Sequence, residues 1–410
     1  MKRITIIFIL FISLIHPQKI LIPMDQTQND HLKAYGIAYY VLKRNINVEW
    51  LLNFQGGSFL IDNHPFIQAE CKIRGVSFLE LGDELLDIYS TIEQNNMDIV
   101  LLEKAPNIAI YSPPNKQPWD DAVTLALTYA EVDYKTLWDE EVINNTLDKY
   151  DWLHLHHEDF TGQYGKFYRN YHNAPWYIEQ KTRFENLAKK FGMKSVHEEK
   201  KAISRIIKNY ISNGGFLFAM CSATDSYDIA LSLENIDGVH SVFDGTPIDK
   251  DIVDKIDFSK SLAFTNYKIY TDPMIYEFSD IDYPPSHNPI TRGAEADYFS
   301  LFEFSAKYDP VPTMLTQNHV PIVKGFMGQT TGFNKNMIKN HVIIMGEDPA
   351  SDQVKYLHGN FGKGTYTFYG GHDPEDYQHF VGDPPTDLSL HRNSPGYLSL
   401  IHIRRCRRAI

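Results

Sequence analysis

The chain has 410 residues, of which 43% are hydrophobic and 13% aromatic, and its formal net charge at pH 7 is −13. This apolar content supports one large domain or two medium ones and excludes general disorder. The 24 Gly and 3 Cys residues are too few for a collagen-like chain or a disulfide scaffold. Because an acidic chain repels phosphate backbones, we expect no nucleic-acid partner.

The two ends of the chain differ in character from the rest. Lys2 and Arg3 precede an apolar run that is shorter than the roughly 20 residues of a spanning helix. We therefore predict a signal peptide over 1–17, export to the periplasm or medium, and no stable membrane anchor; an uncleaved anchor is the alternative. Residues 398–410 resemble a translated sequencing adapter, and we interpret them as an artefact.

Short apolar segments alternate with helical patterns through the first 235 residues. Strands are predicted at 20–24, 48–53, 76–81, 108–112, 134–138, 150–156 and 216–221. Helices are predicted at 31–44, 119–132 and 198–212. Alternation of this kind predicts an α/β fold whose sheet is mostly parallel and is covered by helices on both faces.

The pattern suggests two units and an insertion. A smaller β/α lobe covers 19–105, and a second α/β domain covers 106–397. Between about 240 and 320 the periodicity fades into a loop-rich stretch of Asp, Pro and aromatic residues. Regular strand patterns return at 321–325, 341–345, 355–358 and 365–369.

Cys221 stands where a buried strand pattern meets a helix pattern. Ala219 and Ala223 lie two residues to either side, and small neighbours of this kind suit a tight strand-to-helix turn that presents a nucleophile. Backbone N–H groups at the helix start, including that of Ser222, would stabilise a thiolate and an oxyanion. The alternative is a buried structural cysteine. Cys71 falls in a different predicted helix, so we expect no disulfide between the two.

A candidate base lies near the end of the chain. His372 follows the predicted strand 365–369 and the Gly370–Gly371 pair. Open α/β sheets build their sites at the carboxyl ends of parallel strands, so His372 is placed to take a proton from Cys221 and Glu375 to orient its imidazole. Gly371 and Asp373 are candidate substrate-binding residues; a solvated acidic turn is the alternative.

A third cluster surrounds strand 150–156. Alternation along this strand puts His154 and His156 on one face, and His157 and Glu158 follow at its carboxyl end. One interpretation is a polar wall that positions substrate. The other is a divalent metal site in which His154, His156, His157 and His372 are the candidate ligands, although no standard metal spacing is present.

Several long runs in the chain carry a family resemblance. The order of strand, Cys221, helix and late His372 resembles the class I glutamine amidotransferase-like superfamily, which implies a flavodoxin-like fold and a Cys221–His372–Glu375 triad. The chain is also similar to exported Bacteroidetes proteins labelled asparagine synthetase B. That similarity rests on the runs ILIPMDQTQ, HLKAYGIAYY, YDWLHLHHEDFTGQYGKF, FLFAMCSATDS and FYGGHDPEDYQH.

These observations predict an exported cysteine-dependent amidase, hydrolase or amidotransferase-like enzyme. Its substrate would be a small molecule, a peptide or a glycan. ATP-dependent asparagine synthesis is not supported, because the Ser-Gly-Gly-x-Asp-Ser loop of such synthetases is missing from the sequence. The alternatives are a non-catalytic carbohydrate- or peptide-binding protein on the same fold, and a metal-dependent hydrolase built on His154–His157.

Overall fold

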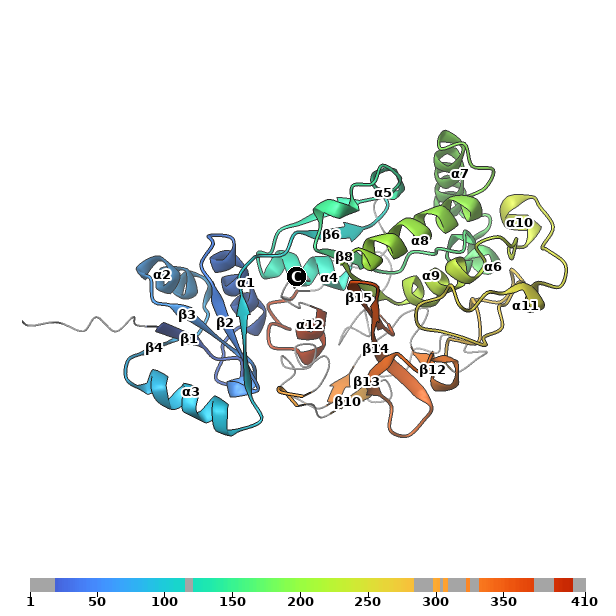
Figure 1. The fold of residues 1–410 in the computed structure, drawn as a ribbon. Helices are drawn as coiled ribbons and strands as arrows, with labels where there is room; N and C mark the ends of the chain where they lie inside the picture. Colours follow the sequence, from blue (N-terminus) through green and yellow to red (C-terminus); the bar gives the residue numbers. More distant parts are fainter. Residues whose placement is uncertain are drawn as a thin grey trace, which may run out of the picture.

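The computed structural model describes residues 19–114, 121–283, 298–302, 305–308, 322–324, 332–371 and 387–400. Within these ranges the strands form two sheets (Figure 1). One sheet of five strands belongs to the N-terminal part, and a larger mixed sheet belongs to the rest of the chain. The predicted signal peptide at 1–17 lies outside the described residues.

The N-terminal sheet is antiparallel throughout. Its strands are ordered β4-β1-β3-β2-β5. Their bounds are β1 Lys19–Ile22, β2 Val48–Leu52, β3 Ser58–Asp62, β4 Leu79–Leu81 and β5 Asp98–Leu102. Helix α1 (His31–Leu42) and helix α2 (Pro65–Arg74) lie on one face of the sheet. Their buried side chains and those of the strands form one core. Helix α3 (Glu84–Gln94) packs on the other face through Ile88 and Ile92.

The larger sheet has the order β11-β10-β13-β14-β15-β9-β8-β6-β7, with β12 paired to β14. Pairing is parallel from β7 through β6, β8 and β9 to β15, and antiparallel beyond β15. The parallel strands are β6 Ile108–Tyr111, β7 Tyr134–Leu137, β8 Trp152–Leu155, β9 Phe216–Met220 and β15 Gly364–Tyr369. The others are β10 Tyr298–Leu301, β11 Ile322–Lys324, β12 Phe333–Asn334, β13 Ile343–Glu347 and β14 Gln353–Phe361.

The prediction of a mostly parallel, flavodoxin-like sheet is therefore wrong. Parallel pairing covers only one part of the larger sheet and none of the N-terminal sheet. The reason lies in the connections: β2 and β3 are joined through Phe54–Gly56, and β14 and β15 through two residues. A parallel pair needs a crossover of a dozen or more residues, so connections this short impose antiparallel pairing.

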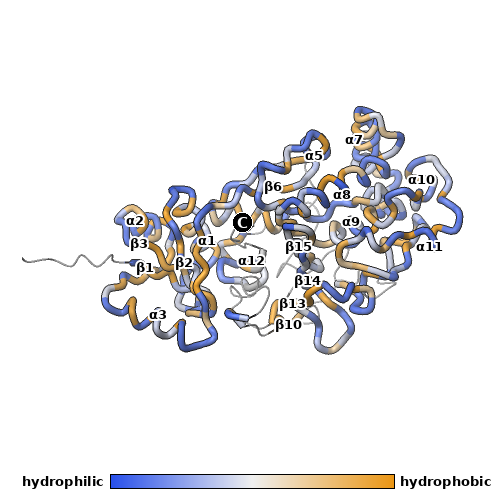
Figure 2. The backbone as a smooth tube through the Cα atoms, viewed as in Figure 1, coloured by the Kyte–Doolittle hydropathy of each residue, from blue (hydrophilic) through white to orange (hydrophobic). Residues whose placement is uncertain are grey.

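Helices cover both faces of the larger sheet. Residues alternate along β9, so that Phe218 and Met220 face a core shared with α1, α4 (Ala122–Tyr129) and α12 (Pro395–Leu400). Leu217 and Ala219 face the opposite core, which includes α7 (Pro175–Lys190), α8 (Val196–Ser212) and α9 (Ser222–Ser232). Figure 2 shows hydrophobic stretches gathered where α1 meets the N-terminal strands. The core thus runs from one sheet to the other without a break.

The remaining α-helices in the described part of the chain are short. They are α5 (Asp139–Ile143), α6 (Tyr168–Tyr171), α10 (Ser241–Asp244) and α11 (Ile252–Lys255). None of the helices in the described part of the chain is long and apolar enough to cross a membrane. Leu398, in the segment interpreted as an adapter, is buried against the core, and 401–410 lie outside the described residues.

Candidate functional site

Cys221 occupies a strained turn between β9 and α9. Its backbone has φ 49° and ψ −136°, and it is the N-cap residue of the helix. Residues other than glycine rarely adopt positive φ. Such backbone outliers cost of order 1–3 kcal/mol and gather at functional sites. The turn predicted from the sequence is thus present, with β9 ending at Met220 and α9 beginning at Ser222.

The polar groups around this turn suit an oxyanion. The backbone N–H of Cys221 donates to the carbonyl of Tyr369 at 3.1 Å, which fixes the end of β15 beside the turn. Among the described residues, the N–H groups of Ser222 and Ala223 have no acceptor, as is usual in the first turn of a helix. The Cys221 side chain is only 1% exposed, so a reaction with substrate requires movement of the groups that cover it.

The predicted partners of Cys221 are described only in part. Gly371 is buried at φ 83°, two residues after the carbonyl that binds Cys221. His372, Asp373 and Glu375 lie outside the described residues. Cys71 is a separate free cysteine in α2, as expected, and burial raises the pKa of its thiol to about 12.

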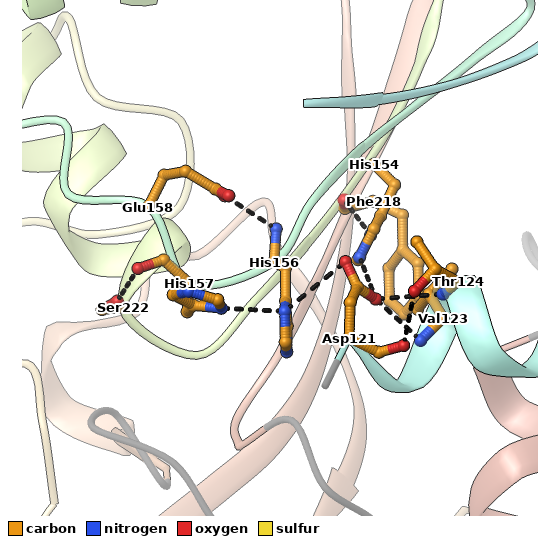
Figure 3. A network of polar contacts seen from close by, with 9 residues as sticks. All are labelled: Asp121, Val123, Thr124, His154, His156, His157, Glu158, Phe218 and Ser222. Atoms are coloured by element: carbon orange, nitrogen blue, oxygen red, sulfur yellow. Dashed lines mark hydrogen bonds and ion pairs between the residues drawn. The ribbon is translucent and has the colours of Figure 1, made fainter. Parts of the chain in front are cut away.

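Two of the predicted histidines are held by one carboxylate (Figure 3). His154 Nε2 and His156 Nδ1 each lie 3.5 Å from an oxygen of Asp121. Asp121 is also the N-cap of α4, where it accepts bonds from the backbone N–H groups of Val123 (2.8 Å) and Thr124 (3.1 Å). The second nitrogen of His154 is 3.2 Å from the carbonyl of Phe218, in β9. Both imidazoles are buried and fixed in orientation.

A chain of contacts leads from these histidines to the Cys221 turn (Figure 3). The Nδ1 atoms of His156 and His157 are 2.8 Å apart, so one ring donates and the other accepts. The carbonyl of His157 accepts the hydroxyl of Ser222 at 2.7 Å. The backbone N–H of His156 donates to Glu158 at 3.0 Å. The segment after β8 is therefore packed against the first turn of α9.

The buried carboxyl groups of this region are shifted in opposite directions. Burial opposes ionisation of Asp121, but the charges of His156 and His154 and the α4 amides outweigh it and lower the pKa of Asp121. Burial raises the pKa of Glu158 to about 8, and the nearby charge of Asp121 adds to the increase. Asp121 therefore stays ionised at neutral pH, whereas Glu158 is largely protonated.

The described side chains around the histidines form polar contacts with one another. Within the described part of the chain, no three His, Cys, Asp or Glu side chains are placed to hold a metal ion. The carbonyl of Phe218 contacts Nδ1 of His154, and an oxygen of Asp121 lies at ion-pair distance, 3.5 Å, from its Nε2. His372, the fourth candidate ligand, lies outside the described residues.

Sequence reasoning missed several groups beside the site. The predicted helix 119–132 includes Asp121 as a helical residue, whereas α4 begins at Ala122 and Asp121 is its N-cap. An Asp directly before an apolar helical pattern is an N-cap signal that would have identified it. Tyr276 and Asp282 interact electrostatically with Cys221 although they lie in the loop-rich insertion. No local pattern predicts this electrostatic effect.

Comparisons with known proteins assign no function to the site. No family model and no curated protein matches the chain. A cytoplasmic protein of Salmonella typhimurium, STM3548, is 10% identical with a TM-score of 0.33, covering 72% of this chain and 95% of its own. The GH42 β-galactosidase Gan42B is 10% identical with a TM-score of 0.28, covering 67% of this chain and 28% of its own. At these TM-scores the similarities assign neither a family nor a function to this chain.

Proposed function

We propose that the protein is a cysteine-dependent hydrolase or amidase in which the Cys221 thiolate attacks the carbonyl carbon of an amide or ester. The observation that supports this most strongly is the backbone of Cys221, held at φ 49° and ψ −136° between a buried strand and a helix. A protein has no structural need for a strained cysteine at a turn where glycine fits better. Strain of this kind is expected where a side chain must be presented for chemistry.

The chemistry follows from the groups at the turn. The thiolate forms a bond to the carbonyl carbon, and the oxygen that becomes negative is stabilised by the N–H groups of Ser222 and Ala223. The leaving amine or alcohol takes a proton from a general acid, and water then hydrolyses the thioester. We propose His372 for the proton transfers and Glu375 for its orientation. In the sequence His372 directly follows Gly371. Gly371 in turn lies two residues after Tyr369, whose carbonyl accepts the Cys221 N–H.

We propose a positioning role for the histidine cluster. His154 and His156 are immobilised by Asp121, and His157 connects them to Ser222. A rigid wall of this kind restricts where a substrate can lie relative to the sulfur.

The test uses the second cysteine of the described chain as an internal control. The native protein is treated with iodoacetamide at neutral pH, and the labelled peptides are quantified by mass spectrometry. We expect Cys221 to be alkylated at least about tenfold faster than Cys71, whose thiol stays protonated. Equal, slow labelling of both cysteines in the folded protein would contradict the proposal and favour a non-catalytic binding protein.

A further inference from the structure

The segment that follows β8 stays beside the Cys221 turn beyond the ends of the strands. In the parallel register Leu155 of β8 pairs with Ala219 of β9. His157 and Cys221 each follow that pair by two residues, and neighbouring strands lie about 4.8 Å apart. The 2.7 Å hydrogen bond from the Ser222 hydroxyl to the His157 carbonyl shows that the contact continues into α9. His157 is therefore level with the proposed nucleophile.

The Cys221 side chain lies on the same side of the larger sheet as the histidine rings. The ring of His154 packs against that of Phe218, with centroids 5.5 Å apart. The ring of His156 follows, 6.1 Å from that of His154. Phe218 and Cys221 belong to one buried core, which also contains the apolar side chains at the start of α4. Asp121 is the N-cap of that helix, so the carboxylate reaches the histidines from the same side.

His156 and His157 form a pair that is backed by this carboxylate (Figure 3). Their Nδ1 atoms are 2.8 Å apart, so a ring proton lies between them. Nδ1 of His156 also lies 3.5 Å from an oxygen of Asp121. His157 is half-buried, whereas His156 is 1% exposed. When His157 takes up a proton, the positive charge can therefore pass inward to His156, next to the carboxylate.

The charges around the pair favour its protonated form. The charges of His156 and His154 lower the pKa of Asp121, and the same attraction stabilises a proton on the pair. The other ionisable groups that act on these residues or on Cys221 are Glu158, Lys200, Asp225, Tyr276 and Asp282. Burial raises the pKa values of Glu158, Tyr276 and Asp282, so these three groups are largely uncharged at neutral pH. Asp121 is the ionised acid that contacts the pair.

We propose that Asp121, His156 and His157 form a relay that keeps Cys221 as a thiolate. The S–H bond of Cys221 breaks, an N–H bond forms at Nε2 of His157, and the electron pair stays on the sulfur. His156 and Asp121 are positioning residues, which stabilise the imidazolium through His157. This inference rests on the proposed function and adds its activation step. The proton transfers to the leaving group and from water stay with His372.

The test follows the alkylation of Cys221 by iodoacetamide as a function of pH, with the labelled peptide quantified by mass spectrometry. An unassisted thiol ionises at about pH 8.5, and below that its thiolate fraction falls about tenfold for each pH unit. We expect the wild-type rate to persist down to about pH 6. In His157→Gln the rate at this pH should fall at least about tenfold, and it should approach the wild-type rate above the pH at which an unassisted thiol ionises.

Two further variants separate charge from shape. Asp121→Asn keeps a capping oxygen but removes the charge, so the profile should move toward higher pH, as in His157→Gln. His341→Gln removes an exposed imidazole outside the relay and should leave the profile unchanged. If wild-type Cys221 reacts in mild acid and His157→Gln does not change its profile, the relay is overturned and the proposed nucleophile stands. If wild-type Cys221 reacts only where an unassisted thiol ionises, both are contradicted.

A second measurement requires neither a reagent that reaches the buried thiol nor a folded His157→Gln variant. The imidazole resonances of His157 are titrated by NMR in wild type and in Cys221→Ala. A neighbouring thiolate stabilises the proton on the imidazole, so removal of the sulfur should lower the midpoint of the His157 titration by about one pH unit or more. A midpoint that is the same in both proteins overturns the relay.

Discussion

At Cys221 the backbone conformation and the side chain make opposing demands. A φ of 49° with ψ −136° favours glycine, yet the position carries a buried cysteine, whose backbone N–H donates to the Tyr369 carbonyl. The strain lowers the stability of the fold, so we expect it to be kept only where the thiol serves a purpose. The strain is therefore a measurable property of the proposed site.

Replacing Cys221 by Gly and by Ala isolates the backbone contribution. We expect Cys221→Gly to be more stable than Cys221→Ala by about 1 kcal/mol, because glycine reaches positive φ without a Cβ penalty. The measurement is the free energy of unfolding in urea. The control pair is wild type and Ala219→Gly in β9, where glycine should instead destabilise. A Cys221→Ala variant as stable as Cys221→Gly would show that the turn is unstrained.

At the scale of elements, the sequence determined the local pieces better than their arrangement. The strand predicted at 216–221 and the helix pattern after Cys221 are both confirmed, as Phe216–Met220 and Ser222–Ser232. Strand β3 was missed because Gly56–Gly57 was not recognised as a turn between β2 and another strand. The electrostatic effect of Cys221 on the pKa of Asp282 depends on packing across the fold, which no local pattern encodes.

Asp121 offers a test at the scale of α4. Asp121→Ala removes two bonds to the first turn of α4 and leaves His154 and His156 without their carboxylate, so we expect a loss of about 1–2 kcal/mol in the free energy of unfolding. Asp121→Asn keeps a capping oxygen and should lose less. Thermal or urea unfolding of the two variants measures the difference. Equal losses would show that the cap contributes nothing.

Across the whole molecule, one apolar core joins the N-terminal lobe to the larger sheet, and buried acids lie near Trp138 in the second core. Lys200 binds both oxygens of buried Asp139 at 2.8 Å, and its ammonium lies 4.0 Å from the centre of the Trp138 ring. The adjacent Glu199 has no hydrogen-bond partner among the described residues, and burial raises its pKa to about 7. Glu158 adds a second raised pKa, of about 8.

These raised pKa values make global stability depend on pH. The folded state retains protons on Glu199 and Glu158 that the unfolded chain releases near its ordinary pKa, so the stability that these two groups contribute is fully present below about pH 4.5 and is lost as pH rises toward 7 and 8. Each group contributes a slope of at most about 1.4 kcal/mol per pH unit within its window. We expect Glu199→Gln to flatten the fall between about pH 4.5 and pH 7. Unfolding curves over this range measure it, with exposed Glu179→Gln as the control that leaves the slope intact.

The central claim is that the Cys221 sulfur attacks carbonyl carbon in the folded protein. The most direct measurement is peptide mass spectrometry after brief treatment with p-nitrophenyl acetate, an activated ester. The account predicts one acetyl group on Cys221, released again on standing, and none on Cys71 or in Cys221→Ser. The account would be contradicted if p-nitrophenyl acetate left Cys221 unacetylated in the folded protein but acetylated it readily in the urea-unfolded chain.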